Sequence, residues 1–137
     1  GMLAFTLPMA DKRLSGIAAE DIGKCAYGIF RKGAETIGQT IGIAGEHLAG
    51  SQMAAALARA LGREVVYNEV TPEAYRGFGF PGAEDLGNMF QFKRDFEEVF
   101  RGHRDPAVAR SLNPKLQSFE AWLAVNGSRI PIAQGAA

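Results

Sequence analysis

The amino-acid sequence predicts a mixed α/β (α+β) domain, with short strands in its first half and helices in its second. Two apolar runs, residues 3–7 and 65–70, are rich in β-branched and aromatic side chains, as strands are. Elsewhere, apolar residues recur at spacings of three and four, which is typical of helices. Because the sequence contains no repeat and no linker-like tract, we expect one unit over residues 1–137.

The first elements follow from local sequence signals. Leu3 to Leu7 is predicted as a strand that ends at Pro8, and residues 11–16 as a turn. A helix is predicted from Asp21 to Lys32, because apolar residues recur at helical spacing, basic residues occupy the last turn and Gly33 follows. Its Cys25 is interpreted as a buried small apolar residue rather than a nucleophile.

A second strand and helix are expected next. Residues 40–44 alternate like a strand, and residues 45–50 are predicted to form a loop. A helix carrying Met53, Leu57 and Leu61 on one face should then end at Gly62. The strand over residues 65–70 follows it.

Three later helices carry recognisable start signals. Thr71 precedes Pro72 and Asp105 precedes Pro106, each pairing a capping residue with proline at the first helical position. Ser118 should cap a final helix that carries Phe119, Trp122 and Leu123. The longest helix is expected over residues 82–100 and central to the core, with one apolar face formed by Leu86, Met89, Phe90 and Phe96.

Composition argues against several classes of protein. Hydrophobic residues make up 47% and charged residues 22% of the chain, with a net charge of +0, as in ordinary globular proteins. Without a basic excess, we expect neither nucleic acid nor a membrane as a partner. With a lone cysteine and no long apolar run, we expect a cytoplasmic protein. Gly1 is interpreted as a tag remnant, and residues 130–137 as a loosely held tail.

The sequence identifies no catalytic, cofactor-binding or metal-binding residue. A dinucleotide loop needs Gly-x-Gly-x-x-Gly between a strand and a helix, and the sequence has none. Gly38, Gly42 and Gly45 are too widely spaced and are interpreted as strand ends and close packing. His47 and His103 lack a second ligand at helical spacing, so surface or loop roles are favoured over a metal site.

Two segments still point to ligand contact. The pair Glu46 and His47 follows the strand expected over residues 40–44, and α/β folds place ligands at such strand ends. In residues 77–83, two phenylalanines flank glycines and a proline at the entry to the longest helix. These rings either attach the turn to the core or contact a ligand, and the first interpretation is favoured.

The order and spacing of several motifs resemble the downstream half of NmrA-like proteins, in particular the redox-sensor branch. The resemblance covers residues 5–130 and rests on these segments: Pro8-Met9, Ile17 to Gly23, Gly38 to Gly42, Val70 to Tyr75, Gly79 to Ala83, Asp85 to Phe90, Leu112 to Pro114, and Phe119 with Trp122-Leu123.

The resemblance implies an atypical short-chain dehydrogenase/reductase with an N-terminal Rossmann half that binds NADP(H) or NAD(H). That half would lie upstream of Met2, so this chain is expected to be a truncated C-terminal part that has no cofactor and no activity alone. The intact protein would be a redox sensor, a regulator or an NAD(P)H-dependent reductase. The residues expected to face the cleft between the halves are Met9, Glu46, His47, Phe78, Phe80, Asn88 and Phe92.

An alternative is a self-sufficient dimeric interaction module without enzymatic activity. In either case, the strand over residues 40–44 and the helix over residues 21–32 would normally pack on the Rossmann half. We therefore expect a homodimer that buries this surface, and a regulatory protein is a second possible partner.

Overall fold

The computed structural model describes residues 2–132 and has the mixed α/β architecture that the sequence predicts. The expectations for Gly1 and for residues 133–137 of the tail lie outside these residues. In chain order the elements are β1 (Leu3–Leu7), β2 (Arg13–Gly16), α1 (Ala19–Lys32), η1 (Gly33–Thr36), β3 (Glu46–Ala49), α2 (Gly50–Leu61), β4 (Val65–Glu69), α3 (Pro72–Arg76), α4 (Ala83–Asp95), α5 (Glu97–Gly102), α6 (Pro106–Leu112), α7 (Phe119–Asn126) and η2 (Gly127–Arg129), where η marks a 3₁₀ helix.

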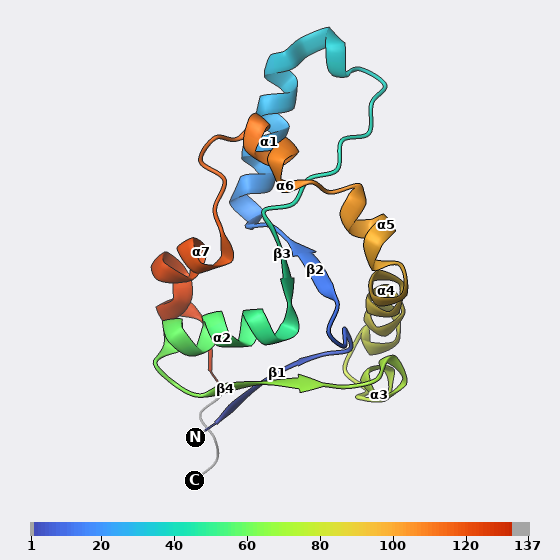
Figure 1. Cartoon of the computed structure of the whole chain (residues 1–137), viewed down its shortest axis with the longest axis vertical. Helices are drawn as coiled ribbons and strands as arrows, with labels where there is room; N and C mark the ends of the chain where they lie inside the picture. The colour runs from blue at the N-terminus through green and yellow to red at the C-terminus, as the bar shows by residue number, and fades with distance from the viewer. Residues whose placement is uncertain (1, 133–137) are drawn as a thin grey trace.

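Two strand pairs organise the described chain (Figure 1). β1 and β4 are parallel, in a register that runs from Leu3 opposite Val65 to Leu7 opposite Glu69. β2 and β3 are antiparallel, from Arg13 opposite Ala49 to Gly16 opposite Glu46. α2 leads from β3 to β4 and packs on β1 and β4. The β2–β3 pair rises from this base toward α1, which projects with η1 from the rest of the molecule.

The secondary structure predicted around the β2–β3 pair is wrong in three places. Residues 13–16 form a strand rather than a turn, and residues 46–49 form a strand rather than a loop. Residues 40–44 belong to no strand. Ile41 and Ile43 alternate because their side chains pack against the cluster around Cys25, and this burial needs no hydrogen-bonded ladder.

The predicted helix over residues 82–100 is broken into α4 and α5 at Phe96, whose φ of −118° and ψ of 36° are not helical. The Glu97 side chain accepts a hydrogen bond from the Arg13 amide, which ties the start of α5 to β2. Phe96 is 54% exposed, and the other members of the predicted face are only half-buried. This face is therefore not the centre of the core.

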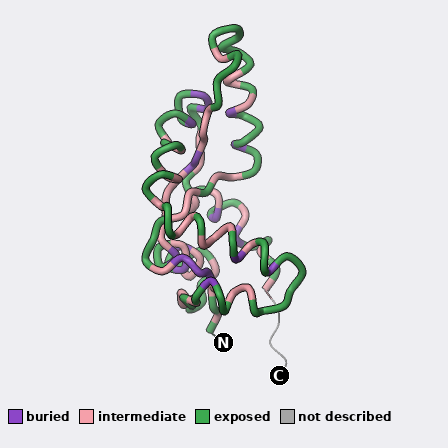
Figure 2. The backbone as a smooth tube through the Cα atoms, turned by 90° about the vertical axis from the view of Figure 1, so that its right-hand side faces the viewer, coloured by how far each residue is buried: buried purple, intermediate pink, exposed green. Residues whose placement is uncertain are grey.

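The core lies instead where α1 meets α6. Cys25, Ala109 and Leu112 are buried together there, surrounded by half-buried Ile17, Ile29, Ile41, Ile43 and Leu116. The interpretation of Cys25 as a buried apolar residue is confirmed. Figure 2 shows buried positions scattered thinly along the chain between long exposed stretches.

Local sequence signals placed the helix starts well. The side chains of Thr71, Asp105 and Ser118 each accept a hydrogen bond from a backbone amide in the following turn, at 2.9 to 3.1 Å. α2 ends at Gly62, as predicted, and Gly62 adopts the left-handed conformation. Gly42 is closely packed, because a Cβ there would lie 1.8 Å from the His103 carbonyl oxygen. Within residues 2–132, no helix has the length and apolar character needed to cross a membrane.

Candidate functional site

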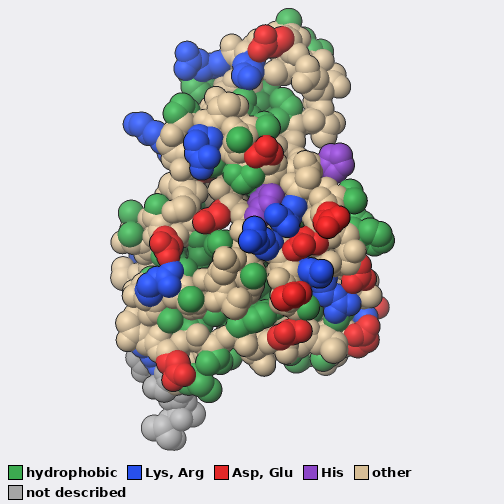
Figure 3. Space-filling model, viewed as in Figure 1, with side chains coloured by type: hydrophobic (Ala, Val, Ile, Leu, Met, Phe, Trp, Pro, Cys, Tyr) green, Lys and Arg blue, Asp and Glu red, His purple; other side chains and the backbone are tan. Residues whose placement is uncertain are grey.

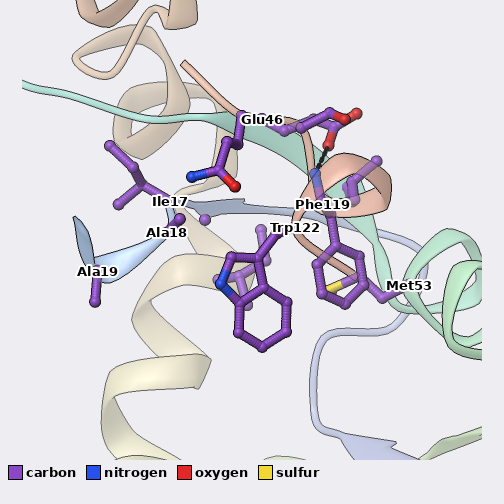
Figure 4. Close-up of a pocket in the computed structure, with 12 residues that line it drawn as sticks. Ile17, Ala18, Ala19, Glu46, Met53, Phe119 and Trp122 are labelled. Carbon is purple, nitrogen blue, oxygen red and sulfur yellow. Dashed lines mark hydrogen bonds between the residues drawn. The ribbon is translucent and has the colours of Figure 1, made fainter. Parts of the chain in front are cut away.

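A pocket of about 360 Å³ opens between the β2–β3 pair, α2 and the start of α7 (Figure 4). Most of its surface is apolar, and three polar side chains interrupt it. The lining residues are Leu14, Gly16, Ile17, Ala18, Ala19, Glu46, Leu48, Met53, Gln117, Ser118, Phe119 and Trp122. We call this the hairpin pocket.

Strand alternation decides which side chains face the hairpin pocket. Leu14 on β2 and Leu48 on β3 line it, and they are register partners. Ser15 lies between Leu14 and Gly16, so it faces the other way. Its buried hydroxyl has no hydrogen-bond partner among the described residues.

α7 supplies the aromatic wall. Ser118 caps this helix, and Phe119 and Trp122 occupy its first turn, spaced so that both rings reach the pocket. Figure 4 shows the two rings beside the sulfur of Met53 from α2. Trp122 is the only tryptophan of the chain.

Glu46 is both a pocket residue and a helix cap. The first position of β3 places its carboxylate at the start of α7, where Oε2 accepts a hydrogen bond from the Phe119 amide at 2.9 Å. A carboxylate there also interacts favourably with the helix dipole. Its Oε1 has no hydrogen-bond partner within residues 2–132.

A buried acid holds the segment that leads into α7. Asp21 is fully buried and accepts hydrogen bonds from Asn113 Nδ2 at 3.1 Å and from the Gln117 amide at 3.0 Å. The Gln117 side chain donates to Glu20 at 2.6 Å and more weakly to Asp21 at 3.4 Å. The first turn of α1 thereby fixes the position of Gln117 on the pocket wall.

From the sequence, Asp21 is predicted only to be a favourable negative charge at the start of a helix. Its partners are 92 and 96 residues away, and no local signal shows that they meet. The aromatic wall and Met53 were likewise assigned to helix faces, without any indication that these faces enclose a pocket.

His47 lies on the opposite face of the β2–β3 pair from Glu46, its neighbour in the chain. Arg101 Nε donates to His47 Nδ1 at 2.9 Å, and His47 Nε2 lies 2.7 Å from the Arg104 carbonyl oxygen. Because Nδ1 is the acceptor, the geometry assigns the imidazole proton to Nε2, which donates to that carbonyl. Both ring nitrogens are therefore used in linking β3 to α5 and the turn after it.

Phe78 and Phe80, which were expected to face the cleft, do not line the hairpin pocket. The Tyr75 ring contacts the rings of Phe78 and Phe80, each with centroids 5.6 Å apart, and that of Phe90 at 5.5 Å. Phe80 and Asn88 border an open depression beside Arg76. Arg76 donates to Asn88 and Gln91 from the same nitrogen, at 3.2 and 2.7 Å.

The seven expected cleft residues thus occupy several separate places. Glu46 lines the hairpin pocket, while His47 faces away from it. Met9 is completely buried. Phe92 is 53% exposed and stacks on Phe96 with ring centroids 5.1 Å apart. Within the described chain, Phe78 and Phe80 are brought together around Tyr75, and Phe80 and Asn88 border one depression.

The face of the molecule seen in Figure 3 has no dominant charge. Figure 3 shows acidic and basic side chains interspersed over the visible face. Among the described residues, no three His, Cys, Asp or Glu side chains gather where they could hold a metal ion. The hairpin pocket is therefore distinguished by its apolar wall and by the Glu46 carboxylate.

Known proteins share this fold. Residues 1–123 match the model of the NmrA-like family. A nucleoside-diphosphate-sugar epimerase from Staphylococcus aureus superposes with a TM-score of 0.69 at 21% identity, over 88% of this chain and 43% of the epimerase. NmrA, a negative transcriptional regulator, gives 0.69 at 21% identity, over 92% of this chain and 43% of the regulator.

A structure of NmrA in complex with NAD gives a TM-score of 0.64 at 24% identity, and again 92% of this chain and 43% of the regulator are covered. The chain therefore spans less than half the length of the solved structures that it matches.

Proposed function

The chain belongs to the NmrA-like family, and from this premise we propose that it forms the C-terminal, substrate- or partner-side part of a cytoplasmic NAD(P)-binding protein. That protein acts as a redox sensor or regulator, or as an NAD(P)H-dependent reductase of the atypical short-chain dehydrogenase type. Support comes from matched solved structures that were determined with NAD and with NADP.

The parallel pair of β1 and β4 carries the proposal. Parallel sheets occur almost only as larger sheets with helices on both faces. Here the described pair has α2 packed against it, and β1 lies beside β4 in parallel register. Such a pair supports the proposal that further strands extend this sheet, as a Rossmann half would.

In this proposal the dinucleotide, NADP(H) or NAD(H), is held by the other half, and this chain alone binds neither form. Of the glycines Gly38, Gly42 and Gly45, the last two are closely packed, whereas a Cβ at Gly38 would meet nothing within 4 Å. Gly42 and Gly45 lie against the backbone at His103 and Gln117. The Gly45 amide donates to the Gly16 carbonyl oxygen at 2.7 Å, so it is not open to a pyrophosphate.

Titration calorimetry tests this proposal on the purified chain. We expect no binding of NADPH or NADH with a dissociation constant tighter than about 10 μM, which corresponds to roughly 7 kcal/mol. A tighter constant for either nucleotide would overturn the assignment of the nucleotide site to the other half.

A second candidate function, a self-sufficient dimeric interaction module without enzymatic activity, is favoured by exposed apolar side chains on α1 and η1. Tyr27, Phe30 and Ile37 are 64%, 81% and 80% exposed on this projecting arm. Because residues 40–44 form no strand, the proposed homodimer surface consists of this arm and the open edge of β1. A regulatory protein could bind the same surface in place of the second copy.

Sedimentation equilibrium at micromolar concentration tests whether the chain forms the proposed homodimer. A homodimer that buries more than about 1,200 Å² in total is expected. Phe30→Ser should weaken it, whereas the same change at exposed Val125 on α7 should not. A monomer at all concentrations would count against this candidate.

A further inference from the structure

We propose that the hairpin pocket binds a protonated amine carried on an apolar, ring-sized body. The inference goes beyond the dinucleotide role proposed above and does not depend on it. It rests on the charge in the pocket, the hydrogen-bonding character of its polar groups, and its size.

The charge comes from Glu46. One oxygen of the Glu46 carboxylate, Oε2, caps α7 by accepting a hydrogen bond from the Phe119 amide. Oε1 has no hydrogen-bond partner among the described residues, and no cationic side chain lines the pocket. A half-buried carboxylate beside apolar walls has lost part of its hydration, so a ligand cation would stabilise it.

The other polar side chains favour a hydrogen-bond donor in the ligand. The side-chain nitrogen of Gln117 donates hydrogen bonds to Glu20 and Asp21, which leaves the side-chain oxygen as an acceptor. Ser118 Oγ accepts from the Ala121 amide with one lone pair and retains a second lone pair that can accept from a ligand. An ammonium group presents three donors and no acceptor, so it suits this group of acceptors better than a carbonyl or a carboxylate.

The walls determine the body of the ligand. Phe119 and Trp122 present aromatic rings, and Met53 adds a polarisable thioether. A cavity of about 150 Å³ holds benzene, so about 360 Å³ leaves room for one ring and a short alkyl chain. A cation over an aromatic face is also favourable, and Trp122 is the best such surface.

The single tryptophan allows a direct binding assay. Trp122 lines the pocket, so its fluorescence should change as the pocket fills. The probes are 4-phenylbutylamine, 4-phenylbutan-1-ol and 4-phenylbutanoate, which share one body and differ in the end group. We expect the amine to bind at least about tenfold more tightly than the alcohol, because a charge-assisted hydrogen bond is roughly twice as strong as a neutral one. The carboxylate should bind more weakly than the alcohol.

Two variants separate the charge from the fold. Glu46→Gln keeps an oxygen that can cap the Phe119 amide but removes the charge, so the amine should lose its advantage over the alcohol. Glu120→Gln makes the same change on an exposed side chain of α7 that pairs with Arg59, and should preserve that advantage.

Three results would overturn the proposal: equal or tighter binding of the alcohol or the carboxylate to the unmodified chain, an amine preference that survives in Glu46→Gln, or no saturable change with any probe. The ligand series on the unmodified chain decides the question even if Glu46→Gln does not fold. NADPH binding is a separate measurement, so the two proposals can fail independently.

Discussion

Asp21 shows how one buried side chain can position a functional surface. Its carboxylate is fully buried and receives hydrogen bonds from Asn113 and from the Gln117 amide. A buried charge is tolerated only where such donors surround it. The position of Gln117 in the hairpin pocket therefore depends on an acid in α1 that does not line the pocket.

Asp21→Asn should destabilise the fold by about 2–4 kcal/mol, because the new amide group directs hydrogens toward donors that have lost their acceptor. Urea denaturation followed by Trp122 fluorescence measures the loss. Glu20→Gln is the matched control: Glu20 is an exposed acid one residue away that receives a bond from the same glutamine. Its cost should stay below about 1 kcal/mol. Equal effects of the two substitutions would show that burial of Asp21 has no special importance.

Cys25 gives the fold a dependence on alkaline pH. Burial raises the pKa of its thiol, and the nearby charge of Asp21 raises it further. Above the ordinary thiol pKa of about 8.5, the unfolded chain loses this proton while the folded chain keeps it. The folded state then binds more protons, so stability present below that pH is lost as the pH rises.

Urea denaturation at pH 7.5, 8.5 and 9.5 should therefore show a decline that Cys25→Ala reduces. Burial also raises the pKa of Tyr67 and lowers that of Lys93. These two groups act with opposite signs, and their ordinary pKa values lie above that of a thiol, so the comparison with Cys25→Ala isolates the contribution of Cys25. An equally steep decline in Cys25→Ala would contradict the assignment.

At the scale of elements, the contact between α1 and α6 depends on a missing side chain. A Cβ at Gly28 would lie 2.3 Å from the Leu112 carbonyl oxygen, whereas one at Gly23 would meet nothing within 4 Å. Both glycines are in α1. Only Gly28 therefore allows the two helices their close approach.

Gly28→Ala should destabilise the chain by about 1–3 kcal/mol, because overpacking against a backbone outweighs the better helix propensity of alanine. Gly23→Ala, on the open side of the same helix, should stabilise it by about 0.5–1 kcal/mol. Thermal or urea unfolding gives both values. Stabilisation by both substitutions would mean that α1 and α6 separate easily.

The elements that the sequence predicts correctly are those with local causes. The caps at Thr71, Asp105 and Ser118 act within one turn, and β4 is a β-branched run. The β2–β3 pair joins residues 30 to 36 positions apart whose side chains are mostly small or polar. α4 ends at Phe96, next to Glu97 and its hydrogen bond to β2, and helical periodicity gives no sign of this long-range contact.

The candidate site was less predictable, because contacts between distant parts of the chain bring its residues together. Glu46 was identified from its place near an expected strand end, and it does line the hairpin pocket, although from the start of a different strand. Glu46 and His47 were expected to face one cleft, but strand alternation sends them to opposite faces. Phe119 and Trp122 were assigned to a helix without any sign of what that helix would face.

For the whole molecule, the described parallel sheet should be open along β1. Leu3 donates its amide to Glu64 on the β4 side, so alternation directs the amides of Ala4 and Thr6 to the other edge. An edge of this kind attracts further strands. Both functions proposed for the chain use it, one through a Rossmann half and the other through a second copy.

Hydrogen exchange at low protein concentration should show the amides of Ala4 and Thr6 exchanging about a hundredfold faster than that of Phe5, which faces β4. Raising the concentration should slow exchange at Ala4 and Thr6 if a second copy pairs with β1. Equal protection of all three amides in the dilute chain would show that another segment already covers this edge.

The pairing of β1 with β4 also determines how long β1 is without its partner strand during synthesis. The two strands are joined across 62 residues, and a ribosome adds about 5–20 residues per second. The apolar segment Leu3–Leu7 therefore leaves the ribosome about 3–12 s before its partner strand does. Throughout that interval β1 lacks its β4 partner and ribosome-associated chaperones can bind it, so the yield of folded protein should depend on the speed of translation between β1 and β4.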